Sequence, residues 1–443
     1  MEQIILWESS GLGRKSYYVF VLIAFIYLIY RYRKQKFSIL IILLFFNGLF
    51  AFFGKSVQNG YRISLVILTI YWILRTNFFR NFNIGSVVIA FLFFSVTFLY
   101  TSYINGDYFS IIFSQYSRYF ILFSLFFILG EFWSSDSFKV WIEKLIYEIL
   151  IVQIGLTLLK FIIVGPTENI VGSVASQGGA IATTLPILGF AFLWTKRKGK
   201  FEIRDWFITI GLVFIGFASL KRAIWFIMPI IIILFMFYIP RIKIPPKVIL
   251  FTLLAVPLVF YLGVRYSPSL NKEGRVGGSF DINYTLDYAQ TYMFGEKKDN
   301  QLGQGRGGAT LLVFNKFIDG NLSEKDWFGY GLRYMYTTDY TQFDELDLGI
   351  SSKAAATGIF QTLVAGGYIG IVATFWFLLS LLVQTKNSRL RHVLIGIFCW
   401  EYILYTGMII RDLSLSFLLI YLILFTLNSD LRGINYSKPV NET

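Results

Sequence analysis

The chain has very little cysteine and histidine, since Cys399 and His392 are the single copies of each among 443 residues. One cysteine cannot form an intrachain disulfide or a thiolate metal cluster. A Ser-His-Asp hydrolase arrangement, a phosphate-binding P-loop and a dinucleotide-binding glycine fingerprint are also missing from the sequence. The sequence therefore predicts neither a bound metal nor a cofactor.

Charge is scarce as well. Only 15% of the residues are charged and 56% are hydrophobic, whereas soluble domains average about 25% charged residues. This composition predicts a protein that crosses a membrane many times. The first residues are mixed in charge and are interrupted by Gly11 and Gly13, unlike a cleavable signal peptide, so we expect the first span to be retained.

Apolar segments of membrane-spanning length recur along most of the chain. Crossing about 30 Å of hydrocarbon takes roughly 20 helical residues. We therefore expect an all-α polytopic membrane protein with about 12–14 transmembrane helices. The predicted spans are residues 15–31, 37–54, 62–75, 84–103, 118–133, 144–164, 178–195, 205–220, 223–240, 248–264, 354–384, 393–410 and 413–428.

One long polar segment interrupts this pattern. Residues 265–353 are rich in Gly, Tyr, Asp and Arg, and unpaired polar groups cost several kcal/mol each in hydrocarbon. We therefore expect three parts. Residues 1–264 hold the first ten helices, residues 265–353 form a large loop with short helices, and residues 354–443 hold three more helices and a tail.

The basic residues are distributed unequally between the two sets of loops. Loops after odd-numbered spans hold 21 Lys and Arg residues, and the opposite short loops hold 8. Because cytoplasmic loops carry the Lys and Arg excess, the long loop is predicted to face outward. The asymmetry accounts for most of the net charge of +14, and the long loop itself holds 10 basic and 12 acidic residues. No nucleic-acid partner is therefore expected.

A few cations lie at predicted outer ends of spans, against this rule. Lys221 and Arg222, in SLKRAIWF (219–226), have almost no loop to solvate them, so they either anchor at the interface or face a polar cavity. A guanidinium suits bidentate binding of phosphate. Arg118 and Arg411 are weaker candidates for the same role, with interface anchoring as the alternative.

The long loop adds further candidates. Glycines flank Arg306 in GQGRGG and allow the backbone to approach a ligand closely. The apolar residues 309–318 then predict a helix, and an acidic and aromatic run occupies residues 336–349. The candidate ligand-binding or acid–base side chains of the loop are Arg306, Tyr330, Arg333, Asp339 and Asp344, with core packing or a solvated surface as the alternative.

These segments resemble the O-antigen polymerase and O-antigen ligase superfamily of bacterial surface-polysaccharide assembly. SLKRAIWF is similar to its Ser-x-Arg segment at the outer end of a mid-chain span. Residues 306–331 resemble its sequence of an Arg, an amphipathic helix and a Gly-x-Gly turn, and IFQTLVAGGYIGIV (359–372) resembles the helix that follows its outer loop. The resemblance covers roughly residues 165–385.

One departure bears on mechanism. Ligases of this family carry a His-Asn pair where the loop meets the next helix, but this chain has SSKAAATG (351–358) there, and His392 is predicted on the cytoplasmic side. The resemblance therefore implies a polymerase that joins polyprenyl-pyrophosphate-linked oligosaccharide repeat units. In this reading Arg222 and Arg306 stabilise the leaving pyrophosphate without a metal, and Asp339 or Asp344 serves as a weak base.

The resemblance also implies the surroundings of the protein. It places the chain in the bacterial inner membrane with the long loop in the periplasm, and its partners are the lipid-linked oligosaccharide, membrane lipid and a chain-length regulator protein. Two alternatives stay open, namely a ligase-type glycan transferase and a non-enzymatic transporter of the lipid-linked unit. One dominant loop and no visible inverted repeat argue against the transporter.

Overall fold

The chain folds into helices throughout the part that the structure describes. The structure is a computed structural model, and it describes residues 11–75, 85–133, 135–167, 170–175, 179–195, 202–239, 246–294, 306–319, 323–335, 346 and 357–425. Helices make up 83% of it, and no strand occurs among these residues. The all-helical class predicted from the sequence is therefore confirmed for the described residues.

The helices before the long loop overlap the predicted spans, although α5, α7 and α8 begin several residues earlier and one predicted span, residues 37–54, is divided. Their bounds are α2 (Gly11–Tyr32), α3 (Ser38–Leu44), α4 (Asn47–Phe52), α5 (Lys55–Arg75), α6 (Gly85–Ile104), α7 (Phe109–Phe132), α8 (Asp136–Val164), α9 (Ile181–Thr195), α10 (Ile203–Ala218), α11 (Arg222–Ile233) with the π-helical η1 (Leu234–Tyr238), and α12 (Pro246–Tyr266).

The second half of the chain holds the loop helices and the last spans. Their bounds are η2 (Pro268–Leu270), α13 (Ile282–Phe294), α14 (Arg306–Asp319), α15 (Glu324–Phe328), η3 (Leu332–Tyr334), α16 (Gly358–Val383), α17 (Ser388–Cys399), the π-helical η5 (Trp400–Leu404), α18 (Met408–Arg411) and α19 (Leu413–Phe425).

Five of the described helices are long and apolar enough to cross a membrane. They are α6, α7, α8, α16 and residues Gly13–Tyr32 of α2, and shorter apolar helices occur at α9, at α11 with η1, and at α19. Large apolar side chains are also exposed on their outer faces, as with Ile89 (55% exposed) and Val96 (66% exposed) of α6. Exposed apolar faces of this kind suit contact with lipid. The helices fit an all-α membrane protein, and the total of thirteen spans stays a prediction.

Two predicted spans are not continuous helices. Residues 37–54 form α3 and α4, which are separated at Phe45 and Phe46. Residues 393–410 form α17, a π-helical turn and the short α18, and Gly407 adopts a left-handed conformation (φ 68°) just before α18. Glycine pays no Cβ penalty in that conformation. The chain therefore changes direction inside the bundle, where a simple length criterion predicts one straight helix.

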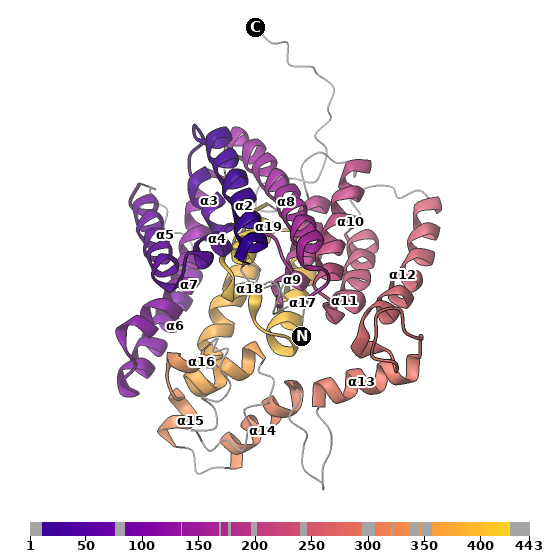
Figure 1. The fold of residues 1–443 in the computed structure, drawn as a ribbon. Coiled ribbons are helices and arrows are strands. Elements are labelled where there is room, and N and C mark those ends of the chain that lie inside the picture. Colours follow the sequence, from indigo (N-terminus) through magenta and orange to yellow (C-terminus); the bar gives the residue numbers. More distant parts are fainter. Residues whose placement is uncertain are drawn as a thin grey trace.

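The most buried helices lie at the centre of the bundle. Every residue of α9 is buried, and so is every residue of α19 from Ser414 to Phe425. A helix that is apolar on all sides belongs in a protein core or in a membrane. Figure 1 shows α9, α18 and α19 in the middle of the molecule, with α5 and α6 at one edge and α12 at the opposite edge. The loop helices α13, α14 and α15 lie together at one end (Figure 1).

Two backbone hydrogen bonds, at a place where both segments contain glycines, attach the long loop to α16. Gly367 has non-helical backbone angles inside α16 (φ 61°), and the N–H groups of Tyr330 and Gly331 donate to the carbonyls of Val364 and Ala365 at 2.8 and 3.1 Å. A Cβ on Gly367 would come within 2.5 Å of the backbone of Trp327. The Gly-Tyr-Gly turn thus occupies hydrogen-bonding positions that a kink in α16 makes available.

Candidate functional site

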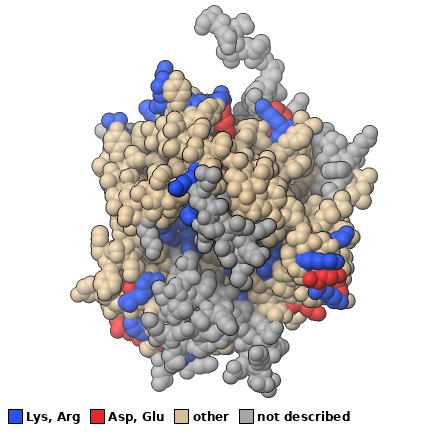
Figure 2. All heavy atoms as spheres, viewed as in Figure 1, with Lys and Arg blue, Asp and Glu red and all other residues tan. Residues whose placement is uncertain are grey.

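A cavity of about 1000 Å³ lies between the loop helices and the bundle. Segments far apart in the sequence line it, including α5, α7, α11, α13, α14 and α18. Among the residues that the structure describes, the charged ones that line it are six cations and one carboxylate: Arg62, Arg118, Lys221, Arg222, Arg306, Arg411 and Asp412. All six cations are partly buried, and Figure 2 shows Lys and Arg side chains in a recess near the middle of one face. Partial burial lowers the effective dielectric constant and strengthens their pull on an anion.

The turn between α10 and α11 directs Lys221 and Arg222 into this cavity. The N–H of Lys221 donates to the carbonyl of Gly216 at 3.1 Å, and the N–H of Leu220 donates to that of Phe217 at 3.0 Å. This pair of bonds is a Schellman motif, which normally has glycine at the left-handed position. Here Leu220 occupies that position with φ 51°. The tight turn leaves only residues 219–221 between the end of α10 and the start of α11 at Arg222, in line with the very short loop expected from the sequence.

Arg222 and Arg306 are held in a row of tyrosine rings. The guanidinium carbon of Arg222 lies 4.9 Å from the ring centre of Tyr288 and 5.6 Å from that of Tyr292. That of Arg306 lies 5.3 Å from Tyr292 and 4.9 Å from Tyr405. The two guanidinium carbons are therefore at most about 11 Å apart, because both lie within 5.6 Å of one ring centre. Ring faces attract cations without neutralising them.

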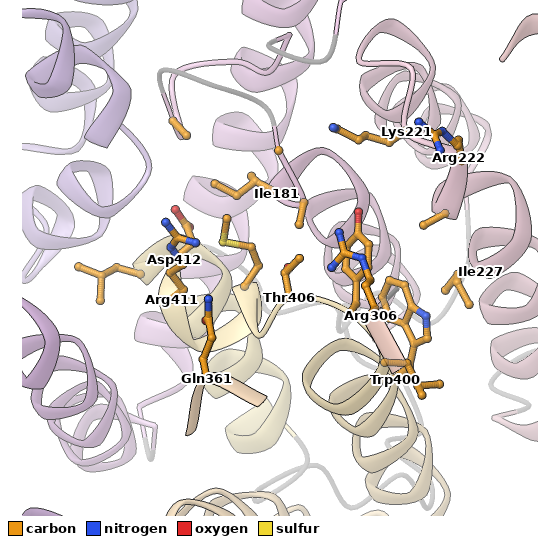
Figure 3. Close-up of a pocket in the computed structure, with 18 of the residues that line it drawn as sticks. Ile181, Lys221, Arg222, Ile227, Arg306, Gln361, Trp400, Thr406, Arg411 and Asp412 are labelled. Atoms are coloured by element: carbon orange, nitrogen blue, oxygen red, sulfur yellow. The ribbon is translucent and has the colours of Figure 1, made fainter. Parts of the chain in front are cut away.

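The opposite side of the cavity has a second group of cations. Arg62 comes from α5, Arg118 from α7 and Arg411 from the end of α18, and both α5 and α18 pack against α7. Figure 3 shows Arg411 and Asp412 across the cavity from Lys221 and Arg222, with Arg306 nearer the latter. Asp412 is buried, and its Oδ1 accepts the N–H groups of Ser414 and Leu415 at 3.0 and 3.2 Å. Asp412 therefore caps α19 at the edge of this group.

The position of α18 depends on a buried carboxylate. Glu401 is fully buried and accepts the N–H groups of Met408 and Ile409 at 2.7 and 3.1 Å, together with the hydroxyl of Thr406 at 3.3 Å. These donors are at the start of α18, where backbone N–H groups have no partner within the helix. Glu401 thus fixes the short segment that carries Arg411 and Asp412.

The structure brings together five of the nine residues proposed from the sequence. They are Arg118, Lys221, Arg222, Arg306 and Arg411. Arg333 and Tyr330 are not among the lining residues of this cavity. The Nε of Arg333 bonds to Asp107 at 2.8 Å, and the N–H of Tyr330 bonds to α16. Asp339 and Asp344 lie outside the described residues. The substrate role proposed for these four residues stays a prediction.

Sequence reasoning missed several polar residues that the structure places at the cavity, among them Arg62, Asp412 and Gln361. Arg62 carries the same signal as Arg222, an outward cation against the charge rule. Asp412 follows Arg411 directly, and an adjacent acidic residue is most simply interpreted as a neutralising charge. Gln361, at the start of α16, gave no signal, because nothing in its neighbourhood shows that α16 points it at the cavity.

His392 is far from Arg222. Its Nδ1 lies 2.8 Å from the Tyr238 hydroxyl, and Tyr238 ends the continuous helical segment that begins at Arg222. The sixteen helical steps from Arg222 to Tyr238, at about 1.5 Å each, place these two residues roughly 24 Å apart. Among the described residues, no group of three His, Cys, Asp or Glu side chains comes together as a metal site would require.

Comparisons with known proteins do not assign the chain to a family. No model of a known protein family matches it, and no curated protein matches it. The resemblance to polysaccharide polymerases and ligases therefore rests on the sequence segments quoted above.

Proposed function

We propose that the chain is a membrane-embedded glycosyltransferase that joins polyprenyl-pyrophosphate-linked oligosaccharide repeat units into a surface polysaccharide. The observation that carries this proposal is the convergence of six partly buried cations on one cavity, against one carboxylate among the lining residues that the structure describes. A cavity with this balance suits a ligand with several negative charges. A bacterial inner membrane and a periplasmic loop belong to the same proposal.

The reaction needs stabilisation of a leaving pyrophosphate. A hydroxyl oxygen of one repeat unit attacks the anomeric carbon of the growing glycan, the bond from that carbon to the pyrophosphate oxygen breaks, and polyprenyl pyrophosphate leaves with the electron pair. Arg222 and Arg306 face the same Tyr292 ring, so one pyrophosphate can bridge them with a phosphate toward each guanidinium. Donors that are already oriented toward developing negative charge lower the barrier most.

The proton of the attacking hydroxyl goes to a base. Asp412 is the carboxylate among the described lining residues, and one of its oxygens already caps α19. The departing pyrophosphate oxygen is a second acceptor for that proton. The tyrosine faces of α13 supply surfaces on which sugar rings stack.

Polymerisation of a defined substrate by the purified protein tests the proposal. The full chain in detergent is mixed with a polyprenyl-pyrophosphate-linked repeat unit, and the products are separated by size. A ladder of multiples with release of polyprenyl pyrophosphate is expected. Transfer only to a different lipid acceptor would favour the ligase-type alternative. Unchanged repeat units together with their movement across vesicles holding the protein would favour the transporter.

A further inference from the structure

The cavity has two cationic sides, and the donor pyrophosphate accounts for one of them. Lys221, Arg222 and Arg306 form the side beside the tyrosines, called here the donor side. Figure 3 shows Arg411 and Asp412 across the cavity from them. With Arg62 of α5 and Arg118 of α7, whose helices pack against each other and, through α7, against α18, these residues are called here the far side. A pyrophosphate that bridges Arg222 and Arg306 leaves the far side without a ligand.

Among the described lining residues, cations outnumber carboxylates on the far side. In this part of the chain as described, three cations from three different helices lie near one carboxylate, Asp412, whose Oδ1 also accepts the N–H groups at the start of α19. Partly buried like charges repel one another and are retained where an anion offsets them. Amide side chains add neutral hydrogen-bonding groups, since Gln361 lines the same side in Figure 3, and Gln58 donates to Asn47 at 3.4 Å beside Arg62.

The fold also fixes these cations in place. Arg118 is on a 24-residue helix that packs against α5 and α18, and Arg411 is held through the contacts of Glu401 with α18. Rigid placement of guanidinium groups suits bidentate recognition of phosphate oxygens. Interface anchoring, by contrast, needs no convergence of side chains from separate helices.

We propose that the far side, Arg62, Arg118 and Arg411, binds a second lipid-linked pyrophosphate, that of the acceptor. This inference rests on the proposed function, because a polymerase joins two molecules that each carry a pyrophosphate. The enzyme then holds donor and acceptor at the same membrane level on opposite sides of one cavity. A phospholipid headgroup offers the same phosphate chemistry from another source, and the experiment separates the two sources.

Counting bound lipids tests the inference. The full-length protein in detergent is titrated with undecaprenyl pyrophosphate, and native mass spectrometry counts the molecules bound per chain. Two are expected for the unchanged protein. The double variant Arg118→Gln with Arg411→Gln is expected to bind one, with the dissociation constant for the second molecule raised by at least about tenfold. Arg275→Gln, an exposed loop cation outside the cavity, is the control and is expected to bind two.

The outcomes separate this inference from the proposed function. One bound molecule in the unchanged protein, or two in the far-side double variant, would overturn the second site. Displacement of the second molecule by equimolar phosphatidylglycerol would overturn it too, since the occupant would then be membrane lipid.

Arg222→Gln with Arg306→Gln is expected to leave one molecule bound. If that variant bound two, the donor site would be wrong, whereas the far-side result would still stand. Arg411→Gln alone repeats the test if the double variant does not fold.

Discussion

The Nε of Arg306 donates a hydrogen bond to the hydroxyl of Tyr292 at 2.9 Å. Arg306 begins α14 and Tyr292 lies near the end of α13, so the bond joins the two loop helices at the cavity. The face of the same ring also lies against Arg222 of the bundle. One tyrosine therefore sets the position of a loop cation relative to a membrane cation, through a hydroxyl that bonds Arg306 and a ring that lies near both guanidinium groups.

Substitutions of Tyr292 are expected to separate these two contributions. Tyr292→Phe keeps the ring face and removes the hydroxyl. The polymerisation rate should fall only several-fold, because the side chain is 38% exposed and water replaces part of the hydrogen bond. Tyr292→Leu removes both contacts and should lower the polymerisation rate further. The rate of the purified protein at saturating substrate measures this. Equal rates for the two variants would mean that only the hydroxyl matters.

Arg222→Lys and Arg306→Lys are expected to reduce polymerisation by about 100- to 1000-fold each, as for loss of one donor to a developing oxyanion. Lysine keeps the positive charge but offers a point charge in place of a planar fork. Arg275→Lys, on the exposed loop surface, is the matched control and should be unchanged. Wild-type chain length from either cavity variant, at equal amounts of folded protein, would return these arginines to interface anchoring.

Glu401 is expected to be a positioning residue. Glu401→Ala leaves the N–H groups of Met408 and Ile409 buried without their acceptor, at a cost of about 1–3 kcal/mol. Glu401→Gln keeps one carbonyl acceptor and should fall between Ala and the unchanged protein, both in thermal stability and in binding of the second undecaprenyl pyrophosphate. Loss of stability in Glu401→Ala with unchanged binding of the second molecule would mean that Glu401 does not place Arg411.

Local patterns predicted individual helices better than they predicted the site. Apolar length identified α6, α8 and α16 to within a few residues at most ends, because a helix in lipid must satisfy its own backbone. The cations of the cavity were found where they violate the charge rule, as at Arg222. Their convergence was not predictable, since it depends on how α5, α7 and α18 pack. The interruption of the helix between Trp400 and Met408 was not predictable either. Glu401 holds it mainly through the backbone N–H groups of Met408 and Ile409, which leave no pattern in the sequence.

The outward direction of the loop can be tested by cysteine labelling. Cys399 is first replaced by Ser, and a single cysteine is placed at the exposed Val276 of the loop or at the exposed Lys34 after α2. An impermeant thiol reagent added to cells with a permeable outer membrane should label the first and spare the second, as the loop charge count predicts. Labelling at Lys34 with protection at Val276 would reverse the topology.

His392→Ala is expected to leave polymerisation unchanged. The imidazole lies beside Tyr238, roughly 24 Å along the helix from Arg222, which is too far for proton transfer to a substrate held at Arg222. Losing its bond to the Tyr238 hydroxyl should cost at most about 1 kcal/mol of stability at this exposed position. Tyr238→Phe removes the same bond while keeping the histidine, so it is the control. If His392→Ala abolished polymer while Tyr238→Phe did not, with equal amounts of folded protein in the membrane, the histidine would take part in the reaction and the site proposed here would be wrong.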